Sequence, residues 1–313
     1  MISVVMSVYN ERLEWLEAAV ESILSQTHRD FEYIVIIDNP QLDCQCDEYL
    51  ERIAASDERV RIHRNERNMG LARSLNVGIR LARGEYIARM DADDISMPNR
   101  LEEELRVIDE HGVDMVTSGR IDIDEDGKVT GQSRRIMSNP YDVLPRTNIV
   151  VHPSVMMRTE VYRELGGYRA FYNSEDYDMW LRILSSGHSI EVIDEPLVYY
   201  RIRSNSMSQK NMLETYYITK YQQLLYRQRV RTGRDDFSEE SFLAYMKTKD
   251  FSERRNRRYV AFRREMDEAI AGYKRRSLEF VPRVAKAFLL FPSAALDNVI
   301  TVVGALRGGG GNE

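Results

Sequence analysis

Cysteine is scarce in this chain of 313 residues, which contains only two, Cys44 and Cys46. Cysteines separated by one residue seldom form a disulfide with each other, and two sulfurs seldom complete a structural zinc site. The N-terminus also lacks the basic start, apolar middle and small-residue cleavage site of a secretory signal. We therefore expect free thiols and a chain that folds in the reducing cytoplasm.

An excess of positive charge is also missing, because 44 lysines and arginines face 50 aspartates and glutamates for a formal net charge of -6. Phosphate-backbone binding favours a basic protein, so this balance argues against nucleic acid as a partner. The charge is uneven along the chain. Residues 252–286 hold eleven basic and five acidic side chains, and the remainder carries the opposite charge.

No glycine-rich phosphate loop follows the first apolar run, Ile2–Val8, which continues instead as Tyr9-Asn10-Glu11-Arg12. Dinucleotide-dependent oxidoreductases carry GxGxxG at this place, and sugar nucleotidyltransferases need a glycine-rich basic loop there. The sequence therefore argues against both classes of enzyme.

Short β-branched runs alternate with helical periodicity over the first hundred residues, which predicts an α/β fold with a mainly parallel sheet flanked by helices. Leu71, Leu75 and Ile79 share one face of a predicted helix, and we expect this helix to stop at Gly84. Pro98 is expected in the first turn of the next helix. The expected strands are Ile2–Val8, Tyr33–Ile37, Val60–His63 and Glu85–Met90.

The pattern changes twice further along the chain. Residues 106–208 mix β-rich stretches with a helix near Tyr177–Ser185, and residues 209–313 are mostly helical and end in Gly308–Gly311. We therefore expect one α/β domain with halves at 1–105 and 106–208, followed by a helical C-terminal extension with a disordered end.

Three carboxylates stand within four residues in Asp91-Ala92-Asp93-Asp94, directly after a predicted strand. Ligands collect at the carboxyl ends of parallel strands, and such a cluster suits a hard divalent cation that bridges a diphosphate. A solvated acidic turn before the following helix is an equally open interpretation of the cluster alone.

The order and spacing of several motifs resemble the family 2 glycosyltransferases, which have the glycosyltransferase A fold. The resemblance covers about residues 1–208 and implies a catalytic domain in which residues 1–105 bind the nucleotide-sugar donor and residues 106–208 bind the acceptor. The motifs are Val5–Glu11, Ile34–Asp38, Asn68–Gly78, Gly84–Asp94, Pro98–Leu101, His152–Ser154, Gly166–Tyr168 and Ser174–Arg182.

The resemblance implies which residues bind a nucleotide-sugar donor. Val8, Tyr9 and Glu11 correspond to the end of the first strand, against the base and ribose, and Asp38 to an aspartate that recognises uracil. Arg73 corresponds to a position near the phosphates, Asp91 to one near the ribose, and Asp93 to the ligand of a manganese or magnesium ion. A turn aspartate before Pro40 and a solvent-facing arginine remain open alternatives for Asp38 and Arg73.

The pair Glu175-Asp176 is the second expected centre, because a sugar hydroxyl needs a carboxylate to take its proton as the new bond forms. The family pattern makes Asp176 this general base, with Glu175 beside the acceptor, and implies inversion at the anomeric carbon. Ser174 or Asp176 is also a plausible cap of the following helix. Trp180 and His152 are expected as packed core residues.

Two positions depart from the family pattern. Ile37-Asp38-Asn39-Pro40 stands where members often carry Asp-Asp-Gly-Ser, and Tyr200-Arg201-Ile202-Arg203 stands where many carry Tyr-Arg-x-His. Arginine does not ligate a metal, although its guanidinium can bind a diphosphate directly. Metal dependence is therefore less firmly implied than the fold.

The C-terminal extension combines basic pairs such as Arg254-Arg255 with the uncharged run 287–296, which is cut by Pro292. This run is ten residues long and a spanning helix needs about 20, so we expect peripheral contact with an anionic membrane through residues 254–306. A basic appendage packed on the catalytic domain or on a second subunit is the alternative.

The function predicted from these patterns is an inverting glycosyltransferase that moves a sugar, expected to be a hexose, from a UDP-linked donor to a hydroxyl of a glycan or lipid-linked acceptor. Its expected place is the cytoplasm, at the inner face of the cell membrane. A non-catalytic nucleotide- or glycan-binding relative, or a membrane-bound scaffold, is the alternative, although neither needs a general base.

Overall fold

The computed structural model describes residues 1–134, 139–203, 211–275 and 277–299. The chain divides into two compact units, one of residues 1–140 and 149–204 and the other of residues 141–148 and 205–313. The expected Gly308–Gly311 end lies outside the described residues. The assignment of 1–105 and 106–208 to donor and acceptor remains a prediction.

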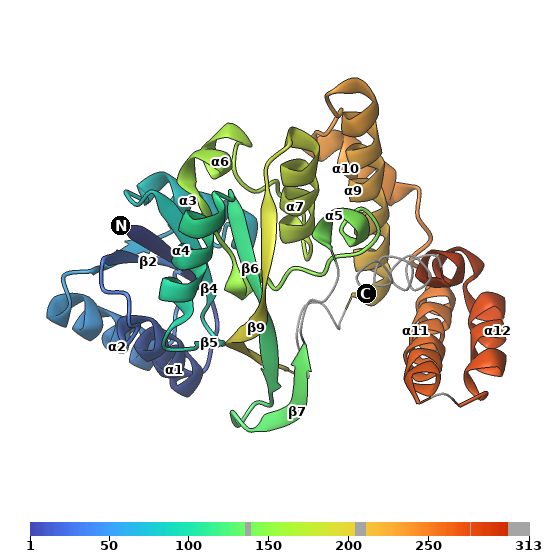
Figure 1. The fold of residues 1–313 in the computed structure, drawn as a ribbon, viewed down its shortest axis with the longest axis horizontal. Coiled ribbons are helices and arrows are strands. Elements are labelled where there is room, and N and C mark those ends of the chain that lie inside the picture. Colours follow the sequence, from blue (N-terminus) through green and yellow to red (C-terminus); the bar gives the residue numbers. More distant parts are fainter. Residues whose placement is uncertain (135–138, 204–210, 276, 300–313) are drawn as a thin grey trace. The chain divides into compact units, whose positions relative to one another are not determined.

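The first unit is built on one nine-stranded sheet (Figure 1) with the order β3-β2-β1-β4-β8-β6-β9-β5 and with β7 paired to β6. Its strands are β1 Ile2–Val8, β2 Phe31–Ile37, β3 Val60–Arg64, β4 Tyr86–Asp91, β5 Ile95–Ser96, β6 Met115–Ile123, β7 Val129–Arg134, β8 Met156–Arg158 and β9 Ile190–Arg201. The α/β fold with flanking helices predicted from the sequence is confirmed.

The four N-terminal strands β3, β2, β1 and β4 are all parallel. Because Val8 pairs with Ile37 and Ser7 with Asp91, the carboxyl ends of β1, β2 and β4 meet at one edge of the sheet. The second half of the sheet is mixed, since β8, β5 and β7 are antiparallel to their neighbours while β9 runs parallel to β6.

Helices cover both faces of the parallel strands. They are α1 Leu13–Leu24, α2 Cys44–Ser56, α3 Leu71–Leu81 and α4 Arg100–His111, and further along the unit come η1 His152–Ser154, α6 Thr159–Glu164 and α7 Glu175–Ser186. The thiols of Cys44 and Cys46 in α2 are free, as predicted.

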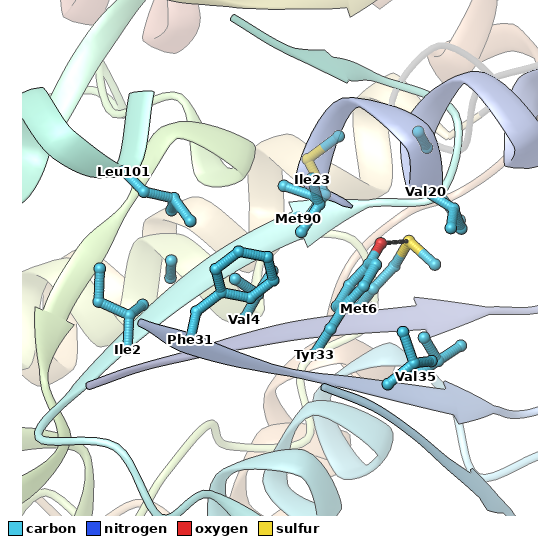
Figure 2. Close-up of a cluster of buried hydrophobic side chains, with 14 of the residues drawn as sticks. Ile2, Val4, Met6, Val20, Ile23, Phe31, Tyr33, Val35, Met90 and Leu101 are labelled. Carbon is cyan, nitrogen blue, oxygen red and sulfur yellow. Dashed lines mark hydrogen bonds between the residues drawn. The ribbon is translucent and has the colours of Figure 1, made fainter. Parts of the chain in front are cut away.

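The main core lies between the strands and α1, α2 and α4. Figure 2 shows Val4, Met6 and Tyr33 from the strands packed beneath Ile23 and Leu101, all of them buried. The Tyr33 hydroxyl donates to the Met6 sulfur at 3.0 Å within this cluster. On the other face, α3 packs against β1 and β2. Strands buried on both faces explain why these runs are almost continuously apolar.

Gly84 does not end the preceding helix, contrary to the prediction. Helix α3 ends at Leu81, and a Cβ on Gly84 would lie 2.6 Å from the backbone nitrogen of Ser3. The Gly84 amide donates to the Ser3 hydroxyl at 2.8 Å. Glycine is therefore required here because two backbones approach closely, and not because a helix stops.

Pro98 is also misplaced by the prediction, since α4 begins at Arg100 and Asn99 is its N-cap. The pairing of β5 with β9 keeps the chain extended just before this proline, and the Met97 amide donates to the Leu197 carbonyl at 2.9 Å. These tertiary hydrogen bonds delay the start of the helix by two residues.

The second unit is helical, with α5 Pro140–Val143, α9 Met212–Thr232, α10 Glu239–Lys247, α11 Glu253–Lys274 and α12 Phe280–Leu290. Its core includes Leu213, Phe262 and Phe291, and α11 packs against α12 (Figure 1). The helical C-terminal extension is therefore present. No helix among the described residues combines the length and the apolar run that a membrane crossing requires.

Candidate active site

The predicted donor residues gather at the carboxyl edge of β1, β2 and β4. Val8 is buried at the end of β1, and its carbonyl accepts a hydrogen bond from the Asp38 amide at 2.8 Å. Tyr9 follows with 45% of its surface exposed. The parallel register thus places the loops after the two strands side by side, as the sequence pattern predicted.

Asp38 organises the loop that leads into α3. Its carboxylate accepts hydrogen bonds from the Asn65 side-chain amide and from the backbone amides of Met69 and Gly70, each at 2.8 Å. Gly70 has a φ of 80°, which favours glycine at this N-cap of α3. Asp38 is therefore an anchor that joins β2 to the start of α3, and it is nearly fully buried.

Asn39 links the same two loops from the other side. Its side-chain amide donates to the Tyr9 carbonyl at 2.9 Å, and its side-chain oxygen accepts from the Gln41 amide at 2.9 Å. Glu11 completes the first loop, because its carboxylate accepts from the amides of Tyr9 and Asn10 at 2.8 and 3.0 Å. Ile37-Asp38-Asn39-Pro40, the departure from Asp-Asp-Gly-Ser, thus forms a turn that side-chain hydrogen bonds hold in place.

Arg73 is exposed on α3, one helical turn after its N-cap. Its exposure fits both the predicted phosphate contact and the solvent-facing alternative. Its role remains a prediction.

The acidic cluster lies at the end of β4. One carboxylate oxygen from each of Asp91, Asp93 and Asp94 lies within 4.8 Å of the others. Asp94 is almost fully buried, and Asp93 is largely buried. This geometry argues against a freely solvated acidic turn, because water has little access to Asp93 and Asp94, and only Asp91 keeps 28% of its side chain exposed.

Burial and mutual repulsion both act on these carboxylates. Burial, followed by the charge of Asp91, raises the pKa of Asp93 to about 7. Burial and then Asp93 raise the pKa of Asp94 well above its ordinary value. One Asp94 oxygen accepts from the Arg201 amide at 2.8 Å, and the other is buried without a hydrogen-bond partner among the described residues.

Three arginines surround the cluster and have different positions. Arg89 is buried and forms an ion pair with Asp91. Arg201 binds the backbone, since its Nε donates to the Asp93 carbonyl at 2.8 Å. Arg203 binds the side chain of Asp93, with its Nε 2.9 Å from Oδ2.

The donor set fits a hard divalent cation. Three converging carboxylates provide the oxygen ligands that magnesium and manganese prefer, and the unpartnered Asp94 oxygen lies within the same group. Two arginines oppose a cation here, because Arg203 already pairs with an oxygen of Asp93 and Arg89 with an oxygen of Asp91.

The second centre lies at the start of α7, where Glu175 and Asp176 are the first two helical residues and Ser174 is the N-cap. Burial, and then the charge of Asp176, raises the pKa of Glu175 to about 7. Asp91 raises this pKa further and Arg89 opposes it. The acidic cluster and the start of α7, which lie more than 80 residues apart in the sequence, therefore share one electrostatic environment.

The sequence patterns missed several residues that hold this environment together. Arg89 lies inside the strand motif and has no separate signal, yet it acts on both centres. The Asn76 side chain accepts a hydrogen bond from the Tyr168 amide and donates one to the Tyr168 carbonyl, each at 2.7 Å. These two bonds join α3 to the loop before α7. In the sequence, Asn76 is noticeable only as a polar residue between apolar neighbours of a predicted helix.

The core interpretations of His152 and Trp180 hold. His152 lies in η1 with its Nε2 2.9 Å from the Tyr168 hydroxyl, and burial lowers its pKa well below the ordinary value. Its ring also lies 5.8 Å from that of Trp180, which is fully buried in α7. Trp180 is therefore a core residue, whereas His152 packs against Tyr168 and Trp180 and stays partly exposed.

A parallel sheet whose carboxyl edge carries three converging carboxylates, extended by a mixed half with a further acidic pair, agrees with the glycosyltransferase A fold that the sequence motifs resemble. The sequence model described as Glycosyl transferase family 2 matches residues 3–166. The chain belongs to this family and is a glycosyltransferase.

Two curated relatives show the extent of the similarity. An uncharacterized glycosyltransferase of Methanocaldococcus jannaschii is 33% identical over 228 residues, which cover 70% of this chain and 78% of the relative. The O-antigen biosynthesis glycosyltransferase WbnJ of Escherichia coli is 35% identical over 225 residues, which cover 71% of this chain and 87% of WbnJ.

The fold is also shared with a solved structure. S. aureus TarS, residues 1–349 in complex with UDP-GlcNAc, aligns with a TM-score of 0.60 at 17% identity, covering 98% of this chain and 89% of that one. At this level of identity the comparison shows the fold alone.

Proposed function

We propose that this glycosyltransferase transfers a sugar from a UDP-linked donor to a hydroxyl with inversion at the anomeric carbon. One observation carries the proposal: Asp91 of the acidic cluster lies close enough to Glu175 to raise its pKa. We therefore expect the cation site for a diphosphate and the carboxylate pair for an acceptor to belong to one active site. An inverting displacement needs these two groups on opposite sides of one sugar carbon.

The donor is expected at the edge formed by β1, β2 and β4. Val8, Tyr9 and Glu11 are assigned to the base and ribose, and Asp38 to the uracil ring. In support, the carboxylate oxygens of Asp38 are fixed by three donors, so little side-chain entropy is lost when a further donor binds. The fold neighbour TarS has been solved with UDP-GlcNAc and with UDP.

Arg73 and Asp91 complete the proposed donor site, near the phosphates and the ribose. Asp93 is the proposed ligand of a magnesium or manganese ion, and Asp94 lies close enough to assist. Such an ion, when bound, neutralises the negative charge that develops on the departing diphosphate. The buried position of the cluster strengthens this attraction, because less water screens it.

Asp176 is the proposed general base. Its carboxylate takes the proton of the acceptor hydroxyl while the hydroxyl oxygen forms a bond to the anomeric carbon, and the bond to the diphosphate oxygen breaks. Glu175 is assigned to the acceptor, beside Asp176. The buried environment that raises the pKa of Glu175 to about 7 suits groups that exchange protons near neutral pH.

The proposed acceptor is a glycan or a lipid-linked molecule, and the proposed location of the enzyme is the cytoplasmic face of a membrane. In the second unit, Arg254, Arg255 and Arg258 line a cavity of about 480 Å³ together with Leu290 and Phe291. Leu278 and Leu289 are about four-fifths exposed on the same helical unit. Basic side chains beside exposed leucines favour contact with an anionic bilayer surface.

The purified full-length chain, assayed against a panel of UDP-, GDP- and dTDP-sugars with a cell extract as acceptor source, tests the proposal. We expect nucleotide release from a UDP-sugar, reduced by EDTA and restored by Mn²⁺. Binding of UDP without turnover of any donor would instead identify a non-catalytic binding relative. The Asp176→Asn variant is the control for release by contaminating hydrolases.

The membrane contact has a separate test. We expect the wild-type chain to sediment with vesicles of phosphatidylglycerol and phosphatidylcholine. Most of the double variant Arg254→Glu, Arg258→Glu should stay in the supernatant. Equal sedimentation of both proteins, or retention on pure phosphatidylcholine, would exclude an electrostatic membrane contact and favour the packed appendage.

A further inference from the structure

Arg203 stands at the position where many family members carry a histidine, and the structure shows what it does there. It follows the end of β9, and its Nε lies 2.9 Å from Oδ2 of Asp93. Its side chain is 33% exposed, so the guanidinium lies at the boundary between the buried cluster and solvent. The proposed metal ligand therefore already has a cationic partner within the chain.

An arginine and a divalent cation compete for the same carboxylate oxygen. The positive guanidinium lies 2.9 Å from Oδ2, an oxygen whose lone pairs a metal ligand must offer. A histidine at this place would add a ligand instead of a competing charge. Arginine in place of histidine therefore weakens binding of the bare ion, where a histidine would strengthen it.

Arg203 is not needed to hold the loop of the cluster in place. Arg201 does this, because its backbone amide binds Asp94 at 2.8 Å and its Nε binds the Asp93 carbonyl at 2.8 Å. The Arg201 guanidinium also donates to the carbonyls of Asp124 and Glu125, each at 3.1 Å. The side chain of Arg203 can therefore change partners while the backbone stays anchored.

We propose that Arg203 is an exchangeable counter-ion, which neutralises Asp93 in the empty site and transfers to the diphosphate of the donor when a divalent cation takes Asp93. The proposal rests on the proposed donor and cation sites. It makes the bare ion a weak ligand and the nucleotide a strong one. Cation and nucleotide should therefore bind together, with each strengthening the other.

The structure includes an internal reporter of this exchange. The Cζ of Arg203 lies 5.8 Å from the ring centroid of Trp15, whose indole Nε1 donates to the Glu125 carbonyl at 2.9 Å. Trp15 is thus held in place while Arg203 moves. The chain contains two tryptophans, and the other, Trp180, is fully buried in α7.

The decisive experiment measures Mn²⁺ and UDP binding in wild type and Arg203→Gln. Free Mn²⁺ is measured by electron paramagnetic resonance without nucleotide, and UDP affinity by calorimetry at saturating Mn²⁺. We expect Mn²⁺ to bind roughly 3- to 10-fold more tightly to Arg203→Gln, and UDP about 10-fold more weakly, the range of one charge-assisted hydrogen bond. A fold defect would weaken both ligands, so opposite signs identify exchange.

Arg12→Gln is the matched control, because Arg12 also lies over Trp15, with its Cζ at 4.5 Å from the centroid, but pairs with Glu125 and not with Asp93. Its Mn²⁺ affinity should change less than twofold. An equal gain in both variants would show that general positive charge, and not the contact with Asp93, weakens the metal. Unchanged or weaker Mn²⁺ binding in Arg203→Gln would overturn the proposal.

Emission of Trp15 provides a second test that needs no change at Arg203. Titration with Mg²⁺ and UDP should alter the emission of wild type and leave that of Trp15→Phe unchanged, and Mg²⁺ is used because it does not quench. An emission that stays constant through saturation overturns the exchange. If no nucleotide sugar is turned over but the Mn²⁺ affinity still rises in Arg203→Gln, the proposed function fails and the pairing at Asp93 stands.

Discussion

Asp38 and Asp93 are aspartates at the same edge of one sheet, yet their surroundings differ. Three donors within the chain saturate much of the Asp38 carboxylate, and two of them are backbone amides. Asp93 instead faces Asp91, Asp94 and one guanidinium, and its pKa rises to about 7 because of burial and the charge of Asp91. The first arrangement builds a loop, and the second keeps charge available for a ligand.

This difference shows that the place of a residue in a family motif does not reveal what the residue does for the stability of the fold. Asp38 has the family position of a base-binding residue and is also an anchor of α3. The acidic cluster contributes little to the stability of the fold, since repulsion and an Asp94 oxygen that has no hydrogen-bond partner among the described residues both lower it. Substitution of Asp38 should therefore lower stability as well as donor binding, whereas substitution within the acidic cluster should affect chemistry without a loss of stability.

The largest effect is expected for Asp176→Asn, which removes the proposed base with little change in shape. The turnover number should fall by about 10²- to 10⁴-fold, the contribution usual for a general base, while UDP affinity stays within about twofold. Initial rates of UDP release and calorimetry measure the two quantities. A near-normal rate would transfer the role of base to Glu175.

Next in size is Asp93→Ala, which should weaken UDP binding by about 10- to 100-fold in the presence of Mn²⁺ and much less in EDTA. The physical reason is the loss of the carboxylate that shares the cation with the diphosphate. Calorimetry with and without EDTA checks this. If the affinity is the same for both proteins in Mn²⁺, Asp93 is not the metal ligand.

The comparison itself is tested by making one substitution at both places. Asp38→Asn should lower the free energy of unfolding by about 1–3 kcal/mol, because a side-chain amide replaces an oxygen that accepts from buried amides. Asp93→Asn should leave it unchanged or raise it, because repulsion within the cluster falls. Urea unfolding of both variants decides, and equal losses would remove the distinction drawn between the two regions.

The last effect, which depends on pH, concerns Glu104, a fully buried partner of Arg100 at 2.9 Å, whose pKa burial raises to about 7. The folded chain then binds more protons than the unfolded chain between pH about 4.5 and about 7, so stability falls as pH rises through that window. Glu104→Gln should flatten this decline by up to about 1.4 kcal/mol per pH unit. Melting temperatures of both proteins from pH 5 to pH 8 measure how stability changes with pH. The loss of the ion pair with Arg100 lowers stability by a constant amount and does not affect this slope. An unchanged slope would place the titration elsewhere.

Much of the first half of the fold was predictable because its signals are local. The apolar runs of β1, β2 and β4 are buried on both faces, and the polar residues that follow them stand where parallel strands end. The errors at Gly84 and Pro98 have one cause. In both places a contact with a distant strand, at Ser3 or at Leu197, overrode a local rule for helix ends.

The sequence by itself determined the α/β order of elements, the acidic residues that follow the strands and the family to which the chain belongs, since periodicity, turn chemistry and motif spacing act along the chain. Only the tertiary structure decided that Asp38 anchors α3, that Arg203 pairs with Asp93 and that Asp91 acts on Glu175. These relations join segments far apart in the sequence. They depend on burial, because removal of water makes the charges of the site act strongly on one another.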